Sequence, residues 1–335
     1  MNKMESKMPK VSVIISAFNH EKYIADSINS VLNQTYKNFE IIVINDGSTD
    51  NTSIIIGEIA NENKDKITFI DHKVNQRPKL SGNEGISLAK GQFIAFNDGD
   101  DIWYPTKLEK QMQMFEHDIL QKIGLVYCYG KNINENSSRF RSEIEAVDVK
   151  EDVFSQLFES AFFFKISMVV RKEVIKAVGL MDERYPYCCD YGLMIRIAAE
   201  GFQFDRVPEV LVGHRIHDAN ETADIVTAQL NTKDMLQDIA IRYNDLIISK
   251  NINIQQRLSV CDLRIARHYF AKGENKRCRE YVLKILKLSP SLFFSDRLLF
   301  PITFLSLMPK SIRNIFKHVK PFNKLFLATY LARTR

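Results

Sequence analysis

The N-terminal part of the chain alternates short apolar runs with amphipathic stretches, and no other feature constrains the fold more. The apolar runs have the length and composition of buried strands, and the amphipathic stretches carry apolar side chains at helical spacing. The expected strands are residues 11–16, 39–45, 67–70 and 93–96, and the expected helices are residues 21–33, 52–61 and a stretch that ends near Lys90. Strands and helices that alternate with short connections are typical of a mostly parallel sheet with helices on both faces. The sequence therefore predicts an α/β fold.

Polar loops follow three of these expected strands. They contain Phe18-Asn19, residues 46–50 and residues 98–101. Parallel strands end at one edge of a sheet, and ligands of open α/β sheets bind at that edge. Neither G-x-G-x-x-G nor G-x-x-x-x-G-K-S/T is present, so the usual glycine-rich phosphate cradles are missing. A nucleotide bound there would need a metal and basic side chains for its phosphates, and Arg77 and Lys79 are near enough in the sequence to help.

Three carboxylates fall within four residues at the end of the strand expected at residues 93–96. Asp98, Asp100 and Asp101 repel one another unless a cation neutralises them, and hard divalent cations favour oxygen ligands. An acidic turn before a helix is the alternative interpretation, because Asp-Gly is a turn signal. Taken alone, the stretch predicts either a metal site or an acidic turn.

Length and composition indicate a globular chain with one large and one small domain. The chain has 335 residues, of which 45% are hydrophobic and 26% charged, so wholesale disorder is not expected. The net charge of +5 is mild, and no nucleic acid partner is expected. The five cysteines show no C-x-x-C spacing, which fits a reduced, cytoplasmic compartment. Residues 1–10 lack the apolar core of an export signal, and no stretch reaches the ~18 apolar residues of a spanning helix.

The later part of the chain changes from mixed to purely helical patterns. The expected strands are residues 123–129, 167–170 and 207–217, the expected helices are residues 106–121, 152–160 and 172–178, and residues 130–150 are expected to form a polar, irregular excursion. From residue 221 the strand signals vanish, and helical periods cover residues 225–248, 254–271 and 275–288. We therefore expect one domain at residues 9–220 and a helical region at residues 221–335.

The C-terminal end combines apolar residues and cations without acids. No Asp or Glu follows Asp296. The apolar run 298–308 is followed by the cations Lys310, Arg313, Lys317, Lys320 and Lys324. This composition is typical of an interfacial helix attracted to anionic lipid headgroups. A helix packed on the protein with a solvated basic face is the alternative. Residues 292–325 are therefore a candidate membrane-surface segment.

Four stretches together resemble glycosyltransferase family 2. They are VSVIISAFNHEKYI (residues 11–24), SVLNQTY (30–36), EIIVINDGSTD (40–50) and AKGQFIAFNDGDD (89–101). The resemblance, which covers residues 9–218, implies the nucleotide-diphospho-sugar transferase fold called GT-A for a catalytic domain at residues 9–220. It also implies that Asp46 contacts the base of a nucleotide diphosphate sugar, with Ala17, Phe18 and Arg77 beside it.

The resemblance assigns the acidic stretch to a D-x-D motif. Asp98 and Asp100 would bind the ribose and a Mn²⁺ or Mg²⁺ ion on the diphosphate, and Asp101 would support that site. Gly99 would let the backbone approach the diphosphate closely. A cation is needed because negative charge builds on the departing nucleoside diphosphate.

Inversion at the sugar carbon also requires a general base, and the resemblance implies that Asp190 supplies it. Asp190 lies at the start of a helical pattern, where an N-terminal cap is the structural reading. The family has Glu-Asp here, and its Asp is the catalytic base, which carries over to Asp190. This chain departs from the family at Cys189, which replaces the Glu, and at Gly192, which replaces a frequent second Asp.

Three further residues are expected on the acceptor or phosphate side. Trp103, the only tryptophan, either lines the sugar or acceptor pocket or is a core residue at a helix start. Arg215 and His217 resemble the family's Tyr-Arg-x-His segment and would lie near the donor phosphates or the acceptor. A surface Arg and His at a strand end is the alternative for that pair.

The resemblance implies a metal-dependent inverting glycosyltransferase that moves one sugar to a hydroxyl of a glycan or lipid-linked glycan, with a UDP-sugar as the favoured donor. It would serve cell-surface polysaccharide synthesis at the inner face of the cytoplasmic membrane. The Gln-x-x-Arg-Trp motif of processive members is absent, which favours single addition. One alternative is a sugar-phosphate nucleotidyltransferase, which would want a glycine- and basic-rich loop where residues 17–20 offer none. Another is a non-catalytic sugar-nucleotide-binding or helical scaffold protein.

Overall fold

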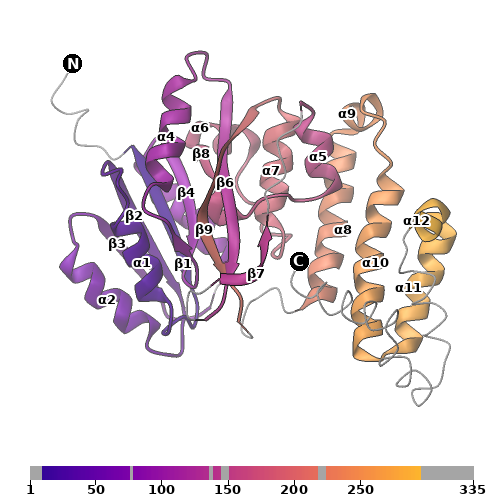
Figure 1. The fold of residues 1–335 in the computed structure, drawn as a ribbon, viewed down its shortest axis with the longest axis horizontal. Helices are drawn as coiled ribbons and strands as arrows, with labels where there is room; N and C mark the ends of the chain where they lie inside the picture. The colour runs from indigo at the N-terminus through magenta and orange to yellow at the C-terminus, as the bar shows by residue number, and fades with distance from the viewer. Residues whose placement is uncertain (1–9, 76–77, 136–138, 145–150, 218–223, 296–335) are drawn as a thin grey trace. The chain divides into compact units, whose positions relative to one another are not determined.

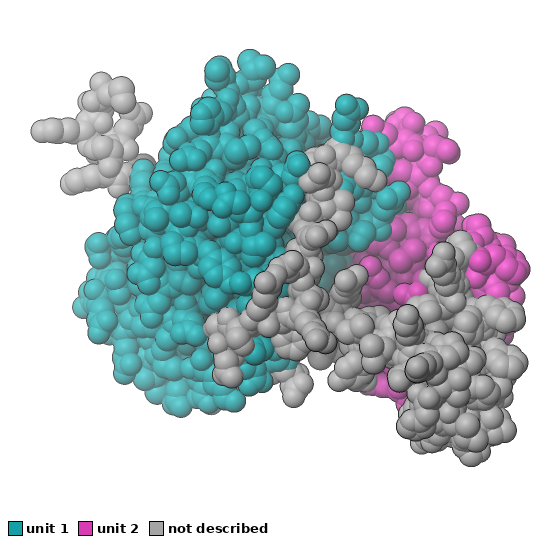
Figure 2. Space-filling model, viewed as in Figure 1, with its two compact units in different colours: residues 1–220 teal, residues 221–335 magenta. Residues whose placement is uncertain are grey.

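The computed structural model describes residues 10–75, 78–135, 139–144, 151–217 and 224–295 (Figure 1). The chain divides into two compact units, residues 1–220 and residues 221–335 (Figure 2). Two predictions from the sequence fall outside the described residues. They concern Arg77 and most of the candidate membrane-surface segment, from residue 296 onward.

The first unit consists of a sheet with helices. Its strands are β1 (Val11–Ala17), β2 (Phe39–Asp46), β3 (Ile67–His72), β4 (Phe93–Asp98), β5 (Ile102–Trp103), β6 (Ile123–Ile133), β7 (Arg139–Ile144), β8 (Val169–Arg171) and β9 (Gln203–Arg215). Its helices are α1 (Ile24–Leu32), α2 (Thr52–Glu62), α3 (Pro78–Leu88), α4 (Lys107–His117), α5 (Val153–Glu159), the 3₁₀ helix η2 (Lys165–Ser167), α6 (Lys172–Val178) and α7 (Cys189–Ala199).

The strands of the described residues form one sheet, in the order β3-β2-β1-β4-β8-β6-β9-β5, with β7 beside β6. The strands β3, β2, β1 and β4 are mutually parallel, as the alternation of strands and helices predicts. Beyond β4 the sheet is mixed, because β8 runs antiparallel to both β4 and β6, whereas β6 and β9 are parallel. The carboxyl ends of β1, β2 and β4 therefore meet at one edge.

Helices cover both faces of this sheet, which confirms the predicted α/β class. Val13 and Ile15 of β1 share a buried cluster with Ile24 and Ile28 of α1. Successive residues of a strand point to opposite faces, so Ile14 faces the other side. There α3 approaches so closely that a Cβ on Gly85 would lie 2.6 Å from the Ile14 side chain.

Residues 130–133 and 139–144, within the region expected to be an irregular excursion, form a strand pair instead. β6 continues to Ile133, and β7 runs antiparallel to it over residues 139–144. The prediction was wrong there because four of the six residues of β7 (RFRSEI) are polar, so its composition does not indicate a strand. The short strand β5 was also not predicted from the sequence. It pairs with β9 and places Trp103 opposite Val212.

The second unit is helical and has its own small core. Its helices are α8 (Ile225–Arg242), α9 (Asn244–Ser249), α10 (Ile254–Lys272), α11 (Asn275–Leu288) and α12 (Pro290–Ser295). Ala266, Phe270, Cys278 and Val282 pack together between α10 and α11. The helix expected at residues 225–248 is interrupted at Tyr243. Within the residues that the structure describes, no helix combines the length and the apolarity that crossing a membrane requires.

Candidate active site

The last residue of β2, Asp46, places a buried carboxylate at the sheet edge. Asp46 is 1% exposed, and its Oδ1 lies 3.4 Å from Nδ1 of His72, the last residue of β3. The other ring nitrogen of His72, Nε2, lies 2.9 Å from Oε2 of Glu84 on α3. The predicted base-binding residue is therefore held in a chain of contacts that crosses two strands and a helix. His72 and Glu84 were not singled out from the sequence.

The loops after β1 and β2 are joined by hydrogen bonds. The backbone N–H of Asn19 donates to Ser48 Oγ (2.9 Å), and Asn19 Oδ1 accepts from the N–H of Thr49 (2.8 Å). Ala17 is buried at the end of β1, and Phe18 beside it is half-buried. These bonds bring the predicted neighbours of Asp46 to the same edge, where the side chain of Phe18 is partly accessible.

Gly47 is the residue that makes the β2 loop possible. Its φ is 70°, and a Cβ at this position would lie 2.5 Å from the backbone nitrogen of Asn75. We expect Gly47→Ala to lower the free energy of unfolding by about 1–3 kcal/mol, because strain and a backbone clash add. Urea unfolding measures this. Gly57→Ala in α2 is the matched control, since its nearest neighbour lies 3.8 Å away, and it should raise stability by about 0.5–1 kcal/mol. Equal effects of the two variants would contradict the prediction.

Asp98 and Asp100 of the expected D-x-D motif have different partners. Asp98 Oδ1 accepts a hydrogen bond of 2.6 Å from Lys165 Nζ. Asp100 Oδ2 lies 3.0 Å from His217 Nε2 and 3.8 Å from His20 Nε2. Burial alone would raise the pKa of Asp100, but the hydrogen bond from His217 and the charges of His20 and His214 outweigh it and lower the pKa to about 2. Asp100 is therefore a carboxylate at neutral pH.

Gly99 lies over packed side chains rather than over open space. A Cβ at this position would lie 2.6 Å from His20 Nδ1 and 3.0 Å from the Cβ of Ala17. Its backbone N–H donates to the carbonyl of Ser16 (2.8 Å), which ties the acidic loop to β1. The absence of a side chain at Gly99 makes room for His20, which in turn approaches Asp100.

Asp101 links the acidic loop, residues 98–101, to the end of β9. Its Oδ1 accepts a hydrogen bond of 2.7 Å from the backbone N–H of Arg215, and its Oδ2 lies 3.3 Å from His214 Nδ1. Burial and the neighbouring Asp100 raise the pKa of Asp101, against the opposing effect of His214. The buried side chain is 2% exposed, so it serves the loop and not a substrate directly.

Arg215 does not reach the surface of the site. It is 0% exposed, and its guanidinium donates to the backbone carbonyls of Asp100 (2.7 Å) and Glu135 (2.7 Å). Arg215 therefore helps to fix the acidic loop. Its expected place near the donor phosphates or the acceptor stays a prediction. His217, two residues later, does face that loop through Asp100, with its ring 5.0 Å from the ring of Tyr23.

Trp103 lies in the hydrophobic core, where one of its two interpretations placed it. It is 3% exposed, and Nζ of the fully buried Lys107 lies 3.7 Å from the centre of its ring. Lys107 Nζ has no hydrogen-bond partner among the described residues. Burial lowers the pKa of Lys107 to about 8. A buried ammonium without a hydrogen-bond partner destabilises the folded state.

Lys107→Met is expected to raise the free energy of unfolding at pH 7 by about 1–3 kcal/mol, because it removes the cost of burying an ammonium group. Attraction between the ammonium and the Trp103 ring offsets part of that cost in the wild type. The folded-state pKa lies below the unfolded one, so the unfolded chain binds more protons between about pH 8 and 10, and wild-type stability rises with pH there. Urea unfolding at several pH values tests both statements. Lys110→Met on the same helix is the control and should change stability by less than about 1 kcal/mol.

Asp190 stands in the first turn of α7 and is not the cap. The N-cap is Cys188, which makes no side-chain capping hydrogen bond, so the expected cap was wrong by two residues. An acid in the first turn still interacts favourably with the helix dipole. Burial raises the pKa of Asp190, while the ammonium of Lys165 opposes that rise. The side chain is half-buried, as a base that meets a substrate must be.

Lys165 connects the two acidic groups and was missed in the sequence. Burial alone would lower its pKa, but the charges of Asp98 and Asp190 raise the pKa above its ordinary value. Asp190 also senses the charge of Asp98. Lys165 therefore hydrogen-bonds Asp98 at the end of β4, and it interacts electrostatically with Asp190 at the start of α7. No motif marks it, because its role depends on long-range packing.

The carboxylates at the end of β4 fit a divalent cation. Mg²⁺ and Mn²⁺ favour carboxylate oxygens, and Mg²⁺ commonly takes one or two of them together with substrate phosphates and water. Within the described ranges no group of three or more His, Cys, Asp or Glu side chains is arranged to hold a metal ion. A cation here would consequently depend on the oxygens of a bound diphosphate as well as on Asp98 and Asp100.

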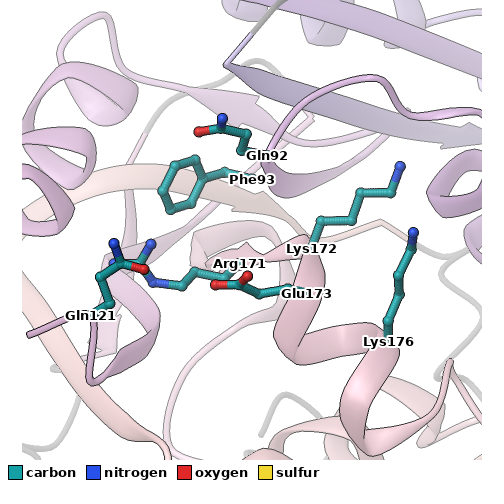
Figure 3. A pocket seen from close by; sticks show the side chains of 7 residues that line it. All are labelled: Gln92, Phe93, Gln121, Arg171, Lys172, Glu173 and Lys176. Carbon is teal, nitrogen blue, oxygen red and sulfur yellow. The ribbon is translucent and has the colours of Figure 1, made fainter.

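A pocket of about 410 Å³ lies away from this edge. Its lining is Gln92, Phe93, Gln121, Arg171, Lys172, Glu173 and Lys176, at the amino end of β4 and the start of α6 (Figure 3). Arg171 points toward Gln121 in Figure 3 and is engaged with Asp118 (3.2 Å) and the carbonyl of Ile123 (2.9 Å). Because the acids lie at the opposite end of β4, we assign the active site to the acidic edge and not to this pocket.

Comparisons with known proteins agree with that assignment. Residues 12–179 match the family model described as Glycosyl transferase family 2. An uncharacterized glycosyltransferase of Rickettsia typhi is 34% identical over 224 residues, which cover 66% of this chain and 68% of the relative. The UDP-Glc:alpha-D-GlcNAc-diphosphoundecaprenol beta-1,3-glucosyltransferase WfaP of Escherichia coli is 28% identical over 246 residues, covering 72% of this chain and 91% of WfaP.

Solved structures share the fold. The mannosyltransferase PcManGT of Pyrobaculum calidifontis, in complex with GDP-Man and Mn²⁺, has a TM-score of 0.60 at 15% identity, covering 98% of this chain and 86% of that one. TarS 1–349 of S. aureus, in complex with UDP, has a TM-score of 0.56 at 18% identity, covering 97% and 87%. With the family match, the GT-A architecture and the acids at its strand ends, this chain belongs to glycosyltransferase family 2 and is a glycosyltransferase.

Proposed function

We propose that the protein is a metal-dependent inverting enzyme that moves a single sugar from a nucleotide diphosphate sugar to a hydroxyl of a glycan or lipid-linked glycan. UDP-sugars are the favoured donors, and residues 9–220 form the catalytic domain. The observation that carries the proposal is that Lys165 donates a hydrogen bond to Asp98 while the charge of Asp190 also raises the pKa of this lysine. It supports a site in which a donor-binding acid and a base lie close enough to act on one substrate pair.

Each acid has one task in this reaction. Asp46 receives the base of the nucleotide, and Asp98 and Asp100 receive the ribose and the metal-bound diphosphate. Asp190 accepts the proton of the acceptor hydroxyl while the oxygen of that hydroxyl bonds to the anomeric carbon. The bond from the anomeric carbon to the diphosphate breaks at the same time. Bound Mn²⁺ or Mg²⁺ would neutralise charge on the departing nucleoside diphosphate. The raised pKa of Asp190 makes it a stronger base than an exposed aspartate.

The named relatives support the donor and acceptor classes. WfaP is named for UDP-Glc and for an acceptor linked to diphosphoundecaprenol, and TarS is solved with UDP. PcManGT is solved with GDP-Man and Mn²⁺, so a GDP-sugar is the second candidate donor. A lipid-linked acceptor would place the enzyme at the cytoplasmic membrane face, where the cations of residues 292–325 would meet anionic headgroups.

A thermal-shift screen of UDP-, GDP-, dTDP- and CDP-sugars with and without Mn²⁺ tests the donor. A donor that binds only the folded state raises Tm in proportion to the logarithm of its concentration over Kd. We expect a UDP-sugar to give the largest shift, to need the metal, and to be hydrolysed slowly with release of UDP. The proposal fails if no nucleotide sugar shifts Tm or turns over in the presence of Mn²⁺ or Mg²⁺.

A further inference from the structure

The imidazole of His72 lies against the carboxylate that is proposed to meet the nucleobase. His72 is the last residue of β3 and pairs with Asp46, the last residue of β2, in the parallel ladder between the two strands. Its Nδ1 lies 3.4 Å from Asp46 Oδ1, and its Nε2 lies 2.9 Å from Oε2 of Glu84. A carboxylate oxygen only accepts hydrogen bonds, so in this arrangement the ring directs an N–H at each of the two acids.

The contact with Glu84 limits the freedom of the ring. Glu84 lies on α3, whereas Asp46 and His72 end two neighbouring strands. An imidazole held at both nitrogens cannot turn about its Cβ–Cγ bond without losing a contact. Helix α3 itself lies close to the sheet, because a Cβ on Gly85 would lie 2.6 Å from the side chain of Ile14. The N–H of His72 that faces Asp46 is therefore held in a fixed position.

Nucleobases differ in the number of N–H groups that they present to a carboxylate. Uracil has one, at N3, with a carbonyl oxygen on either side. Guanine has two, at N1 and at the 2-amino group, which fit the two oxygens of one carboxylate as a parallel, bidentate pair. Hypoxanthine, the base of inosine, is guanine without the 2-amino group and again presents a single N–H. A carboxylate that already accepts a hydrogen bond at one oxygen therefore favours a base with one N–H.

We propose that His72 is a specificity-determining residue that selects uracil over guanine in the donor. Its N–H is directed at Asp46 Oδ1, so the second N–H of a guanine would meet an oxygen that already accepts a hydrogen bond. Two donors beside one buried oxygen repel each other, whereas a carbonyl oxygen of uracil can face the imidazole N–H. Glu84 is a positioning residue, because it holds the ring and not the base. The inference rests on the role of Asp46 in the proposed function.

The first test uses the wild-type full chain and needs no substitution. Isothermal titration in the presence of Mn²⁺ gives Kd for UDP, GDP and inosine diphosphate. The two purine nucleotides differ only in the 2-amino group, so the ratio of their Kd values reports the effect of the second N–H. We expect inosine diphosphate to bind about 10-fold more tightly than GDP, because a buried donor is left without an acceptor. Binding of GDP as tight as that of inosine diphosphate, or tighter, overturns the inference.

Substitutions at His72 then assign the effect to this ring. In His72→Phe, which keeps a ring without an N–H, GDP should gain about 10-fold on inosine diphosphate. In His72→Asn, whose side-chain amide can take the place of Nδ1, the wild-type ratio should be kept. His117→Phe, at the exposed end of α4, is the matched control and should also keep it. An unchanged ratio in His72→Phe overturns the inference, and so does an equal change in His72→Phe and His72→Asn.

The outcomes separate this inference from the proposed function. If the wild type transfers sugar from a GDP-sugar as readily as from a UDP-sugar, the selectivity of His72 fails while the proposed transfer reaction stands. If Asp46→Asn binds all three nucleotides as the wild type does, the role of Asp46 fails, and the inference fails with it. If no nucleotide binds to the wild type in the presence of Mn²⁺ or Mg²⁺, the proposed function fails.

Discussion

Asp190→Asn is expected to lower kcat by about 10²–10⁴-fold, because the carboxamide cannot accept the proton of the acceptor hydroxyl. Asn has nearly the same shape, and Asp190 is not the cap of α7, so the helix should keep its N-terminal turn. Donor binding should be retained, since the nucleotide is expected to lie on Asp46 and the β4 acids. Rates with saturating donor and Tm shifts by the same donor separate the two effects.

The pH dependence of the wild type follows from the same residue. Burial raises the pKa of Asp190 above its ordinary value, and activity needs the ionised form. The rate should therefore fall as the pH drops through that raised pKa. Glu200→Gln is the matched control, because it makes the same chemical change at the exposed C-cap of α7. A rate loss in Glu200→Gln as large as in Asp190→Asn would mean that helix α7, and not the base, is being disturbed.

Asp100→Ala is expected to abolish the metal-dependent part of donor binding and to lower kcat/KM by at least about 100-fold. The carboxylate is ionised at neutral pH and held by His217 and His20, so it is preorganised for a divalent cation. Isothermal titration of UDP with and without Mn²⁺ measures the loss. Removal of the metal from the wild type with EDTA should reproduce it.

The exposed Asp65, in the turn before β3, provides the control for this experiment. Asp65→Ala removes the same charge from the protein without touching the acidic edge, so titration of UDP should give the wild-type affinity. The assignment of Asp100 would be wrong if Asp100→Ala still bound UDP more tightly with Mn²⁺ than without it. Loss of binding in the presence and absence of metal alike would point to a collapsed loop, since Asp100 also contacts His217.

Much of the candidate site could be predicted from the sequence, because it depends on the pattern of apolar and polar residues along the chain. Apolar runs of strand length at residues 11–16, 39–45 and 93–96 predicted β1, β2 and β4, and the polar residues after them had to fall at one sheet edge. Asp46 and Asp98 occupy that edge as predicted from the strand order. Asp190 was found by resemblance, although its place within α7 was shifted by two residues.

Other roles could not be read in this way. Trp103 and Arg215 are residue types that often line sites, yet both are buried. Trp103 pairs with Val212 of β9, and Arg215 pairs with Ile133 of β6. His72, Glu84 and Lys165 carry no motif and act through contacts made across the sheet. A sequence pattern reports neighbours along the chain, whereas these contacts arise between elements separated by many residues.

The sequence by itself determined the class of the fold, the edge at which the acids gather and the family, because hydrophobic periodicity and motif spacing are local properties. Only the tertiary structure decided what each acid touches. It placed Lys165 against Asp98, set the guanidinium of Arg215 against the acidic loop, and brought His217 to Asp100. Ionisation depends on burial and on charges a few ångströms away, and those distances exist only in the folded chain.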